Sequence, residues 1–403
     1  MKIALIKETK IPVDNRVALS PMQAAELNKR YPQHQIVAQR SAIRCFSDEE
    51  YAAAGVELVD SVADCDVLFG IKEAQPDGLV EGKHYFYFGH VAKMQAYNRG
   101  MLQGMMEKGI TFSDYEYLTD DHHQRVCAFG WWAGVVGVYY TLRGWGLRTG
   151  AYDLPKPDLR FTLEQLKQNL LSVKLPKVKM LVTGAGRVSQ GAQYILGEIG
   201  ALRWTEEKFM SEADADGLVY TEGDVDKLVK HREGKAFEWD EFVQNPNAYV
   251  SDFARWAKAA DLLLCGHFWG PEAPVYLDEE LLRNDELRIR MVGDVTCDIM
   301  GSIRSTLRSS THDAPYYDYD RKARGEAAPF SGDDHITVMA VDTCPNALAM
   351  DTSAYFGQML TEHVIVPLLE GRESDVIERS TILRQGEITE PFGYLNEWVN
   401  NEK

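Results

Sequence analysis

The sequence predicts an α/β protein of two domains, in which strands and helices alternate along the chain. Three observations lead to this fold class. Short apolar strands alternate with amphipathic helices over the first 125 residues, the alternation restarts after Pro176, and the restart contains a strand, a glycine turn and a helix. Alternation of this kind places helices over a largely parallel sheet. A chain of 403 residues is also too long for one core.

In the first region, four short runs are expected to be strands because they are β-branched or aromatic and are bounded by turn residues. They are KIALIKE (2–8), QIVAQ (35–39), DVLFGIKE (66–73) and YFYFGH (85–90). Residues 21–31 and 47–54 have the spacing of amphipathic helices, and a Ser-Asp-Glu-Glu cap signal opens the second. A parallel sheet with helices over it is therefore expected here.

Residues 126–142, VCAFGWWAGVVGVYYTL, form a run of 17 residues without a charge. A membrane-spanning helix needs about 20 apolar residues, so this run lies at the short limit. Three glycines and the flanking Arg125 and Arg143 are equally typical of a helix buried between layers of protein. We interpret the run as a buried helix and expect no membrane partner.

The second region follows a connector, 155–176, that contains one amphipathic helix. Strands are expected at 178–183, 201–205, 261–265, 288–295 and 335–341, and helices at 188–199 and 352–369. The acidic segment 206–249 is expected to be a surface insertion. The segment 312–334, rich in Tyr, Asp, Arg and Pro, is expected to cross the surface or the rim of an active site. The tail from Glu373 is expected to add a short hairpin.

Composition excludes several classes of partner. Asp and Glu outnumber Lys and Arg by 61 to 43, which gives a formal charge of −18. Such a surface repels nucleic acid and anionic membranes, although a local basic pocket remains compatible with it. The six cysteines are dispersed without a C-x-x-C pair, as is typical of free thiols in a reducing compartment. We therefore expect a cytoplasmic protein with no bound metal.

The first motif that carries chemistry is the glycine turn between a strand and a helix. Gly184 and Gly186 supply the tight turn and the close backbone approach that a dinucleotide pyrophosphate needs, and Arg187 and Val188 open the helix. At the position of the usual third glycine this chain has Ser189, which is also small. A plain glycine turn in an α/β domain is the alternative interpretation.

The choice of dinucleotide depends on the end of the next strand. An acidic residue about 20 positions on would bind the adenosine ribose hydroxyls and select NAD. The expected strand end is Thr205, followed by Glu206 and Glu207, and neither glutamate has the ideal spacing. Arg203 would instead favour a 2′-phosphate. NAD is favoured, and NADP is not excluded.

Charged and titratable residues cluster near the expected strand ends of the first region. Lys72 and His90 each close an apolar strand, at the sheet edge where ligands bind in α/β folds. The remaining candidates are Lys10, Arg16, Glu73, Lys93, Glu116, Asp120, Asp121 and Arg125. Each has a plain structural alternative: a solvated strand end for Lys72, a surface ion pair for Arg16, a structural histidine for His90.

The order and spacing of these motifs resemble the alanine dehydrogenase and transhydrogenase superfamily, and within it the L-lysine-forming saccharopine dehydrogenases. The segments that carry the resemblance are KETKIPVDNRVALSP, FGIKEAQ, YFGHVAKMQ, DYEYLTDDHHQRVCAFGWWAGVVG, LVTGAGRVSQGA, GDVTCDIMGSI and ITVMAVDTCPNALAMDTS. They span nearly the whole chain. Lys72, His90 and Arg16 are shared by both branches, whereas the LTDD…RVCAFG…AG stretch is typical of the saccharopine branch.

The resemblance implies two doubly wound, Rossmann-like domains with the active site in the cleft between them. Residues 1–135 plus 345–403 would form the catalytic and substrate domain, and 136–344 the dinucleotide-binding domain. The segment 206–249 is larger than the resemblance leads us to expect. The implied reaction is NAD-dependent oxidation of a secondary amine, followed by addition of water and cleavage to an amino acid and a 2-oxo acid.

The resemblance also implies roles for individual residues. His90 and Lys72 would transfer protons, with His90 acting on the carbinolamine oxygen and Lys72 on nitrogen or water. Glu73 and Glu116 would set their pKa values. Substrate carboxylates would meet the cations Arg16, Arg125, Lys93 and Lys10. Asp294 and Asp298 would contact the nicotinamide ribose or the substrate amine, with a helix cap or turn as the structural alternative.

Two other functions remain open from the sequence. Reductive amination of a simple 2-oxo acid with ammonia, as in alanine dehydrogenase, needs fewer cations than saccharopine does. A nucleotide-binding sensor without catalysis would need neither Lys72 nor His90.

The turn Cys265–His267 and the pair His122 and His123 lack companion ligands at metal-binding spacing. The sequence leaves the oligomeric state open, a homo-oligomer included.

Overall fold

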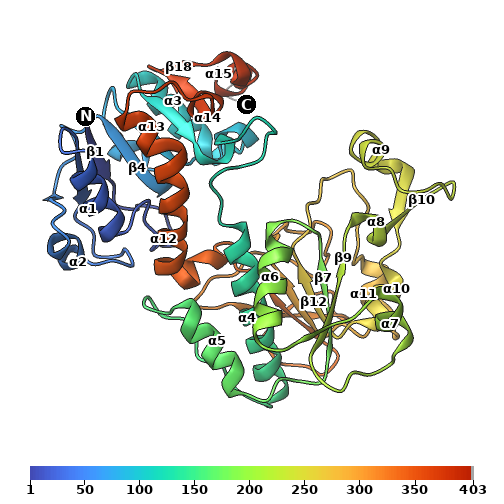
Figure 1. The fold of residues 1–403 in the computed structure, drawn as a ribbon. Coiled ribbons are helices and arrows are strands. Elements are labelled where there is room, and N and C mark those ends of the chain that lie inside the picture. Colours follow the sequence, from blue (N-terminus) through green and yellow to red (C-terminus); the bar gives the residue numbers. More distant parts are fainter. Residues whose placement is uncertain (401–403) are drawn as a thin grey trace. The chain divides into compact units, whose positions relative to one another are not determined.

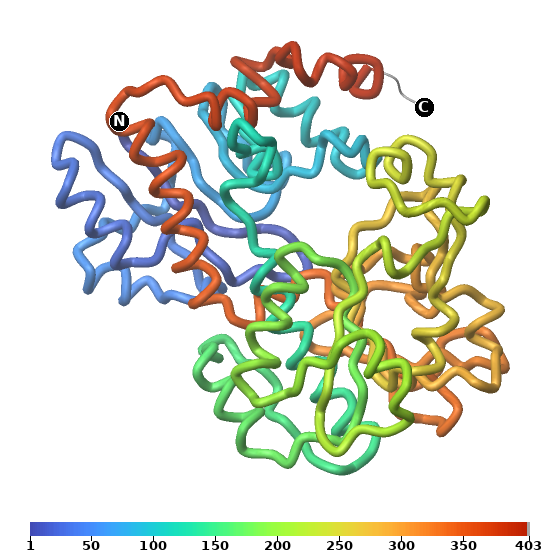
Figure 2. Tube along the Cα trace, turned by 45° about the vertical axis from the view of Figure 1, so that its right-hand side comes forward, coloured from blue at the N-terminus to red at the C-terminus, as the bar shows by residue number. Residues whose placement is uncertain are grey.

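The computed structural model describes residues 1–400, and their backbone divides into two units (Figure 1). One unit contains Met1–Phe129 and the chain from Leu348 onward, and the other contains Gly130–Ala347. In Figure 2 the C-terminal part of the chain returns beside the N-terminal part within the first unit. The hydrogen bond from the backbone N–H of Val17 to the Ser353 hydroxyl, 2.9 Å long, is one of the bonds that hold it there.

The first unit is built on an eight-stranded sheet in the order β18-β17-β6-β5-β4-β1-β2-β3. Six strands are parallel; at one edge β17 adds antiparallel to β6, and β18 adds antiparallel to β17. Their bounds are β1 Lys2–Leu5, β2 Gln35–Gln39, β3 Leu58–Val59, β4 Val67–Lys72, β5 His84–Phe88, β6 Thr111–Asp114, β17 Thr381–Arg384 and β18 Glu387–Ile388. The central strands are almost entirely buried, as their apolar runs predict.

The helices of the first unit begin where the sequence supplies capping residues. Ser20 and Ser47 each accept a bond from the third backbone N–H of the helix that follows, in a capping box. The α-helices are α1 Pro21–Arg30, α2 Asp48–Ala53, α3 Arg99–Glu107, α12 Ala349–Leu360, α13 Val366–Leu369, α14 Asp375–Ser380 and α15 Leu395–Asn400. A π-helical turn, Thr361–Ile365, joins α12 to α13, so the predicted helix at 352–369 starts three residues earlier and has an irregular centre.

The second unit contains another eight-stranded sheet, in the order β15-β14-β16-β13-β12-β7-β9-β8. Its strands are β7 Lys179–Thr183, β8 Leu202–Arg203, β9 Val219–Gly223, β12 Leu262–Cys265, β13 Met291–Asp294, β14 Tyr316–Asp320, β15 Gly325–Ala327 and β16 Ile336–Met339. All pair in parallel except β14 and β15. A separate hairpin joins β10 Val229–His231 to β11 Tyr249–Ser251.

The α-helices of the second unit are α4 Gly130–Thr149, α5 Leu163–Ser172, α6 Arg187–Glu198, α7 Glu206–Ser211, α8 Val225–Leu228, α9 Trp239–Gln244, α10 Ala254–Ala259 and α11 Glu279–Arg283. The longest, α4, starts four residues later and ends seven residues later than the apolar run at 126–142. It packs against α6, β12, β13 and β16, which explains the lack of charge along that run. No helix within residues 1–400 is long and apolar enough to cross a membrane.

The expectation that 206–249 is a surface insertion is wrong in part. This segment supplies β9, which pairs with β7 along its full length and separates β7 from the short edge strand β8. Val219, Tyr220 and Thr221 are buried. Acidic residues on both sides of the strand hide it in the sequence, because a five-residue strand gives little periodicity of its own.

The segment 312–334 is also part of the sheet rather than a surface crossing. It forms β14 and β15, which extend the sheet antiparallel beyond β16. The buried Asp318 of β14 accepts a 2.7 Å bond from the Thr337 hydroxyl of β16 and lies 3.7 Å from the guanidinium of Arg148. A charged residue argues against a strand when only the sequence is known. Here the hydrogen bond from Thr337 and the charge of Arg148 compensate for the burial of Asp318.

Helices α4 and α6 cross at a contact that only glycine permits. A Cβ atom on Gly134 would lie 1.9 Å from the carbonyl oxygen of Val188, and one on Gly191 would lie 1.8 Å from that of Trp131. Both obstacles are backbone atoms, which cannot move aside as a flexible side chain can. Gly134 in the 126–142 run and Gly191, two residues after Ser189, therefore permit the same close contact between the helices.

We expect Gly134→Ala and Gly191→Ala each to lower the free energy of unfolding by at least about 3 kcal/mol, the scale of a severe packing defect. Gly197→Ala is the matched control, because it lies in the same helix as Gly191 and its added Cβ would meet no atom within 4 Å. That control should raise stability by about 0.5–1 kcal/mol through helix propensity. Denaturant unfolding monitored by circular dichroism measures all three, and equal effects at the three positions would contradict the interpretation.

Candidate functional site

The candidate residues of the first unit meet at one edge of its sheet. Strands β1, β4, β5 and β6 are parallel neighbours, so their carboxyl ends lie along the same edge. Lys72 is the last residue of β4, His90 follows β5 by two residues, and Glu116 follows β6 by two. The loop after β1 supplies Lys10 and Arg16. This convergence is the usual origin of ligand sites in α/β sheets.

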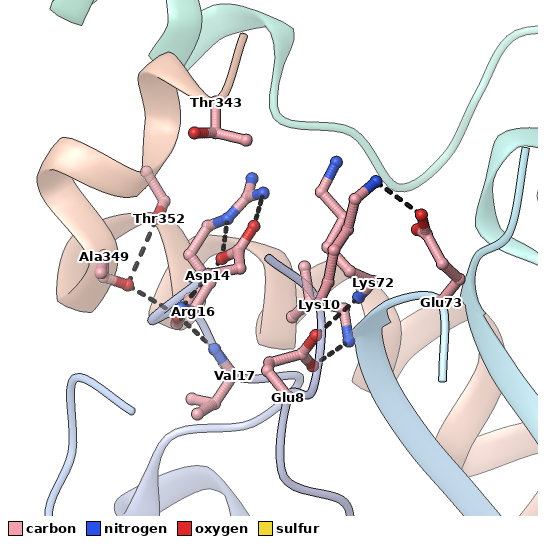
Figure 3. Close-up of polar contacts among 12 residues, drawn as sticks. Glu8, Lys10, Asp14, Arg16, Val17, Lys72, Glu73, Thr343, Ala349 and Thr352 are labelled. Carbon is pink, nitrogen blue, oxygen red and sulfur yellow. Dashed lines mark hydrogen bonds and ion pairs between the residues drawn. The ribbon is translucent and has the colours of Figure 1, made fainter. Parts of the chain in front are cut away.

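Glu73 links two of these residues. Its Oε1 lies 2.5 Å from the ammonium of Lys10, and its Oε2 lies 3.9 Å from the imidazole Nδ1 of His90 (Figure 3 shows the Lys10 pair). Both Glu73 Oε2 and His90 Nδ1 are buried without a hydrogen-bond partner among residues 1–400. Unsatisfied buried polar atoms are costly, so two of them side by side indicate a place where a ligand group or water completes the bonding.

Glu116 holds a second pair of cations. Its Oε1 accepts hydrogen bonds of 3.0 Å from both the Lys93 ammonium and the Arg125 guanidinium. Burial disfavours ionisation of Glu116, but the charges of Lys93 and Arg125 outweigh it and hold its pKa below the usual range. The side chains of Lys93 and Arg125 are about half exposed, at 53% and 46%, so both can also reach a solute.

Arg16 is fixed by a buried partner that the sequence does not reveal. Its Nε and Nη2 donate to the two carboxylate oxygens of Asp14 at 2.9 and 2.5 Å, a bidentate pair drawn in Figure 3. The guanidinium also lies 4.2 Å from the ring centroid of Phe129. Burial opposes ionisation of Asp14, yet Arg16 keeps the pKa of that carboxyl low. The surface ion pair considered for Arg16 is therefore a buried one.

His90 combines an unusual backbone conformation with a neutral imidazole. Its backbone is left-handed, with φ 54° and ψ 17°, a conformation uncommon for a residue with a side chain and often found at functional sites. Burial and then the nearby charge of Lys72 lower the pKa of His90 to about 4. The imidazole is thus neutral at pH 7, and its Nδ1 faces the Glu73 carboxylate rather than a permanent partner.

The charges around His90 favour an anionic ligand. Lys10, Lys72, Lys93 and Arg125 supply four cations there, and Glu73 and Glu116 are the carboxylates that pair with three of them. Two further carboxyl groups, Glu8 and Asp114, lie at the same edge, but burial raises their pKa values to about 8 and about 7, so they carry less than two negative charges at pH 7. Asp14 neutralises Arg16 locally. An excess of positive charge at one sheet edge stands out on a chain with a formal charge of −18. The arrangement can therefore bind carboxylates while keeping a neutral imidazole available for proton transfer.

In the second unit, the turn after β7 has the geometry of a phosphate-binding loop. Gly184 has φ +86°, and a Cβ atom on it would lie 2.8 Å from the Cα of His267, so only glycine fits. Gly186 is the N-cap of α6, and no side chain caps that end. A Cβ on Gly186 would meet no atom within 4 Å, so the space before the helix is open. The N–H groups of Arg187 and Val188 begin this twelve-residue helix.

The acidic residue that sequence reasoning missed is Glu222. It lies at the carboxyl end of β9, the strand next to β7, paired in register with Val182. Its Oε1 is buried without a hydrogen-bond partner among residues 1–400, while Oε2 accepts a 2.9 Å bond from Arg203. This is the position at which a carboxylate binds the adenosine ribose in dinucleotide-binding folds. The residues therefore fit a dinucleotide.

The expectation that Thr205 ends a strand is wrong. Thr205 follows β8, an edge strand that pairs only with β9, and its side chain caps α7 by accepting a bond from the backbone N–H of Lys208. Spacing alone misled the assignment, because the strand adjacent to β7 comes later in the chain than usual. Arg203, which would have favoured a 2′-phosphate, is paired with Glu222.

Asp294 has the structural role that was the alternative for it. Its carboxylate is fully buried at the end of β13 and accepts bonds of 2.6 Å from the hydroxyls of Thr296 and Thr306. Burial raises the pKa of Asp294, and these bonds oppose the rise. The carboxylate thereby shapes the loop that leads to Asp298, whose backbone N–H donates to the Thr296 hydroxyl. Asp298 lies at the same sheet edge as the glycine turn.

His267 is also structural. It is buried between the Thr183 hydroxyl, 2.6 Å from its Nδ1, and the Ser302 hydroxyl, 2.7 Å from its Nε2. It therefore ties the end of β7 to the loop after β13 and supports the glycine turn. Residues 1–400 contain no group of three or more His, Cys, Asp or Glu side chains placed to hold a metal ion.

Comparison with known proteins confirms the resemblance that the motifs predict. Residues 4–136 match the family model described as alanine dehydrogenase/PNT, N-terminal domain. An alpha-aminoadipic semialdehyde synthase of Arabidopsis thaliana is 26% identical over 98% of this chain, which covers 41% of that protein. A saccharopine dehydrogenase (NAD⁺, L-lysine-forming) of Emericella nidulans is 25% identical, with 89% of this chain and 90% of that protein aligned.

The alpha-aminoadipic semialdehyde synthases that match are longer proteins, and this chain spans less than half of their length. Among solved structures, an L-alanine dehydrogenase aligns with 99% of this chain and 100% of its own at a TM-score of 0.66 and 17% identity. At that identity the likeness bears on the fold alone. It confirms the predicted fold class of two α/β, Rossmann-like domains with mainly parallel sheets.

The burial of His267 gives a pH-dependent stability that can be measured. Burial lowers its pKa to about 3, so the folded state excludes a proton that the unfolded state binds below about pH 6.5. Stability should therefore fall as the pH falls from 6.5 toward 3, and His267 alone should remove about 2 kcal/mol between pH 7 and pH 5. In denaturant titrations, His267→Gln should be less stable at pH 7 but should lose about 2 kcal/mol less than wild type over that interval. Parallel losses in the two proteins would contradict the assignment.

Proposed function

We propose that this protein is an NAD-dependent oxidoreductase that reversibly cleaves saccharopine or a similar secondary amine to an amino acid and a 2-oxo acid. The match of residues 4–136 to the alanine dehydrogenase/PNT N-terminal domain is the premise of this proposal. The observation that carries the proposal is a cluster at one sheet edge: a neutral imidazole with a buried Nδ1, a Glu73 oxygen without a hydrogen-bond partner among residues 1–400, and four cations. The alignment with saccharopine dehydrogenase over most of both chains supports the same substrate.

The two units take different parts in this proposal. The first, residues 1–129 and 348 onward, would bind and transform the amine, because it holds Lys72, His90 and the cations. The second, 130–347, would bind NAD, with Gly184, Gly186 and the start of α6 at the pyrophosphate and Glu222 at the adenosine ribose. A dinucleotide held there would supply the acceptor for a hydride from the carbon that carries the amine nitrogen.

Proton transfers are left to the protein's own residues. Hydride loss converts the amine to an imine, to which water adds, and the carbinolamine then breaks its C–N bond. His90, neutral at pH 7, can take the proton of the attacking water or of the carbinolamine hydroxyl at a ring nitrogen. Lys72 would exchange a proton with the amine nitrogen that leaves. Glu73 would steady the imidazolium that forms, since its Oε2 lies 3.9 Å from Nδ1.

The cations fit a substrate with several carboxylates. Saccharopine carries three, and Arg125, Lys93 and Lys10 each combine a carboxylate partner on the protein with partial exposure. Arg16, held by Asp14, presents a planar guanidinium of fixed orientation. All six cysteines are free thiols, and we propose a reducing compartment such as the cytoplasm for this protein.

The proposal predicts turnover of saccharopine with NAD, followed by the absorbance of reduced nicotinamide in purified protein. Lysine with 2-oxoglutarate and reduced NAD should drive the reverse reaction. His90→Ala should keep NAD binding and lose at least about 10²-fold in turnover, the usual scale for a general acid–base group. Activity only with alanine, or with pyruvate and ammonia, would replace saccharopine by a simple amino acid. Cofactor binding without turnover of any amine would favour a sensor.

Glu222 predicts the cofactor preference. Replacing it by Gln removes the charge that favours ribose hydroxyls and disfavours a 2′-phosphate, so NAD binding should weaken about 10-fold while NADP binding weakens less or improves. Fluorescence titration of each reduced cofactor measures both constants. Thr205→Val is the matched control at the position that spacing suggested, and it should leave the ratio unchanged. A larger effect of the control than of Glu222→Gln would refute the assignment.

A further inference from the structure

Two buried carboxylates hold the strand ends that carry Lys72 and His90. Glu8 Oε1 accepts a 2.6 Å bond from the backbone N–H of Ile71, and Oε2 accepts a 2.9 Å bond from that of Lys72. Asp114 Oδ2 accepts bonds of 3.1 Å from the backbone N–H groups of Gly89 and His90. Figure 3 shows the Glu8 bonds. Each carboxylate comes from the strand, or the loop after the strand, next to the one it holds.

These side-chain hydrogen bonds continue the pairing of neighbouring strands beyond the point where the backbone hydrogen bonds between them end. The pairing of β1 with β4 extends to Leu5 and Phe69, and the last backbone bond runs from Ile6 N–H to the Phe69 carbonyl. Beyond it, the Glu8 side chain supplies the acceptors that a continuing β1 would have supplied to β4. Asp114, the last residue of β6, does the same for the chain beyond β5. Unpaired backbone donors at these buried positions would be costly.

A glycine lies in tight packing beside each carboxylate. A Cβ on Gly89 would lie 2.5 Å from the ring of Phe112, and one on Gly70 would lie 3.1 Å from the side chain of Ile6, with Asp114 Oδ2 and Glu8 Oε1 each at 3.4 Å. A glycine thus stands one residue before His90, in FGH, and two residues before Lys72, in FGIK. Asp114 Oδ1 also accepts a 2.9 Å bond from the Glu116 backbone N–H, so one side chain fixes both His90 and Glu116.

Burial makes the ionised forms of Glu8 and Asp114 unfavourable. It raises the pKa of Glu8 to about 8 and that of Asp114 to about 7, and the bonds from backbone N–H groups oppose the rise. His90 carries a cost as well, because its left-handed backbone needs support from its surroundings. Neutral serine or threonine hydroxyls would cap a strand end at lower cost. Carboxylates at these two places are therefore explained better by positioning than by stability.

We propose that Glu8 and Asp114 are positioning residues of the reaction: Glu8 sets the place of Lys72, and Asp114 sets the places of His90 and Glu116, each through backbone N–H groups. This inference rests on the proposed function for its kinetic consequences. A misplacement of about 1 Å can cost about 10²-fold in rate, so loss of either carboxylate is expected to lower turnover without touching a substrate.

The test replaces each carboxylate by its amide, Glu8→Gln and Asp114→Asn, and assays at pH 9, where both wild-type groups are ionised. The amide keeps the shape but turns an N–H donor toward a backbone N–H. We expect kcat with saccharopine to fall at least about 10-fold in each variant, with KM for NAD unchanged. Asp66→Asn is the matched control, because Asp66 accepts the Lys2 N–H at 2.7 Å at the opposite edge of the same sheet. It should leave kcat unchanged.

Double variants separate positioning from a loss of stability. Glu8→Gln should have little further effect once Lys72 is alanine but its full effect once His90 is alanine, and Asp114→Asn should show the reverse pattern. Full additivity in all four combinations, or unchanged kcat in both single variants, would overturn the inference.

A readout without turnover separates this inference from the proposed function. Hydrogen exchange should rise at residues 71 and 72 in Glu8→Gln and at residues 89 and 90 in Asp114→Asn, and at neither site in Asp66→Asn. Inactive wild type would refute the proposed function, while the exchange pattern would still report which backbone each carboxylate holds. Unchanged exchange at both sites would overturn the inference whether or not the protein is active.

Discussion

The burial of charge at the carboxyl edge of the first sheet is the constraint on which the site depends. A charged group removed from water must be paired or hydrogen-bonded, or it loses its charge. The carboxyl groups described at this edge respond in two ways. Asp14, Glu73 and Glu116 pair with cations, whereas Glu8 and Asp114 accept backbone N–H groups, which only partly offset their burial, so their pKa values rise to about 8 and about 7. The neutral His90 stands among them because burial keeps a proton away from it.

The two units solve a similar problem with different groups. In the first, the carboxyl groups of Glu8 and Asp114 accept the backbone N–H groups at two strand ends. In the second, the buried imidazole of His267 lies between the hydroxyls of Thr183 and Ser302, and the Asp294 carboxylate at the end of β13 accepts from the hydroxyls of Thr296 and Thr306. The helix α6 begins without a side-chain cap. An electropositive edge suits a substrate rich in carboxylates, and an open helix start suits a pyrophosphate.

The candidate residues at the ends of apolar strands could be predicted from the sequence, because the residues of such a strand are enough to identify it. Lys72 and His90 belong to this class, and so does the turn at Gly184 and Gly186. Sequence reasoning missed Glu8, Asp14 and Asp114, since their partners are set by which strands are neighbours. Asp14 and Arg16 are only two residues apart, yet nothing in the sequence shows that both are buried. Glu222 was missed for a further reason: its strand lies inside a segment whose acidic composition is typical of a surface insertion.

The error at Thr205 shows what spacing can and cannot establish. The rule of an acidic residue about 20 positions after the glycine turn assumes that the next strand in the chain is also the next strand in the sheet. Here β8 comes first in the chain but lies at the edge, and β9 takes the place beside β7. The chemistry therefore follows the sheet rather than the count: the carboxylate is present at the expected strand end, on a residue 17 positions later than Thr205. Adjacency in the sheet, which only the fold supplies, decides which acidic residue can meet a ribose.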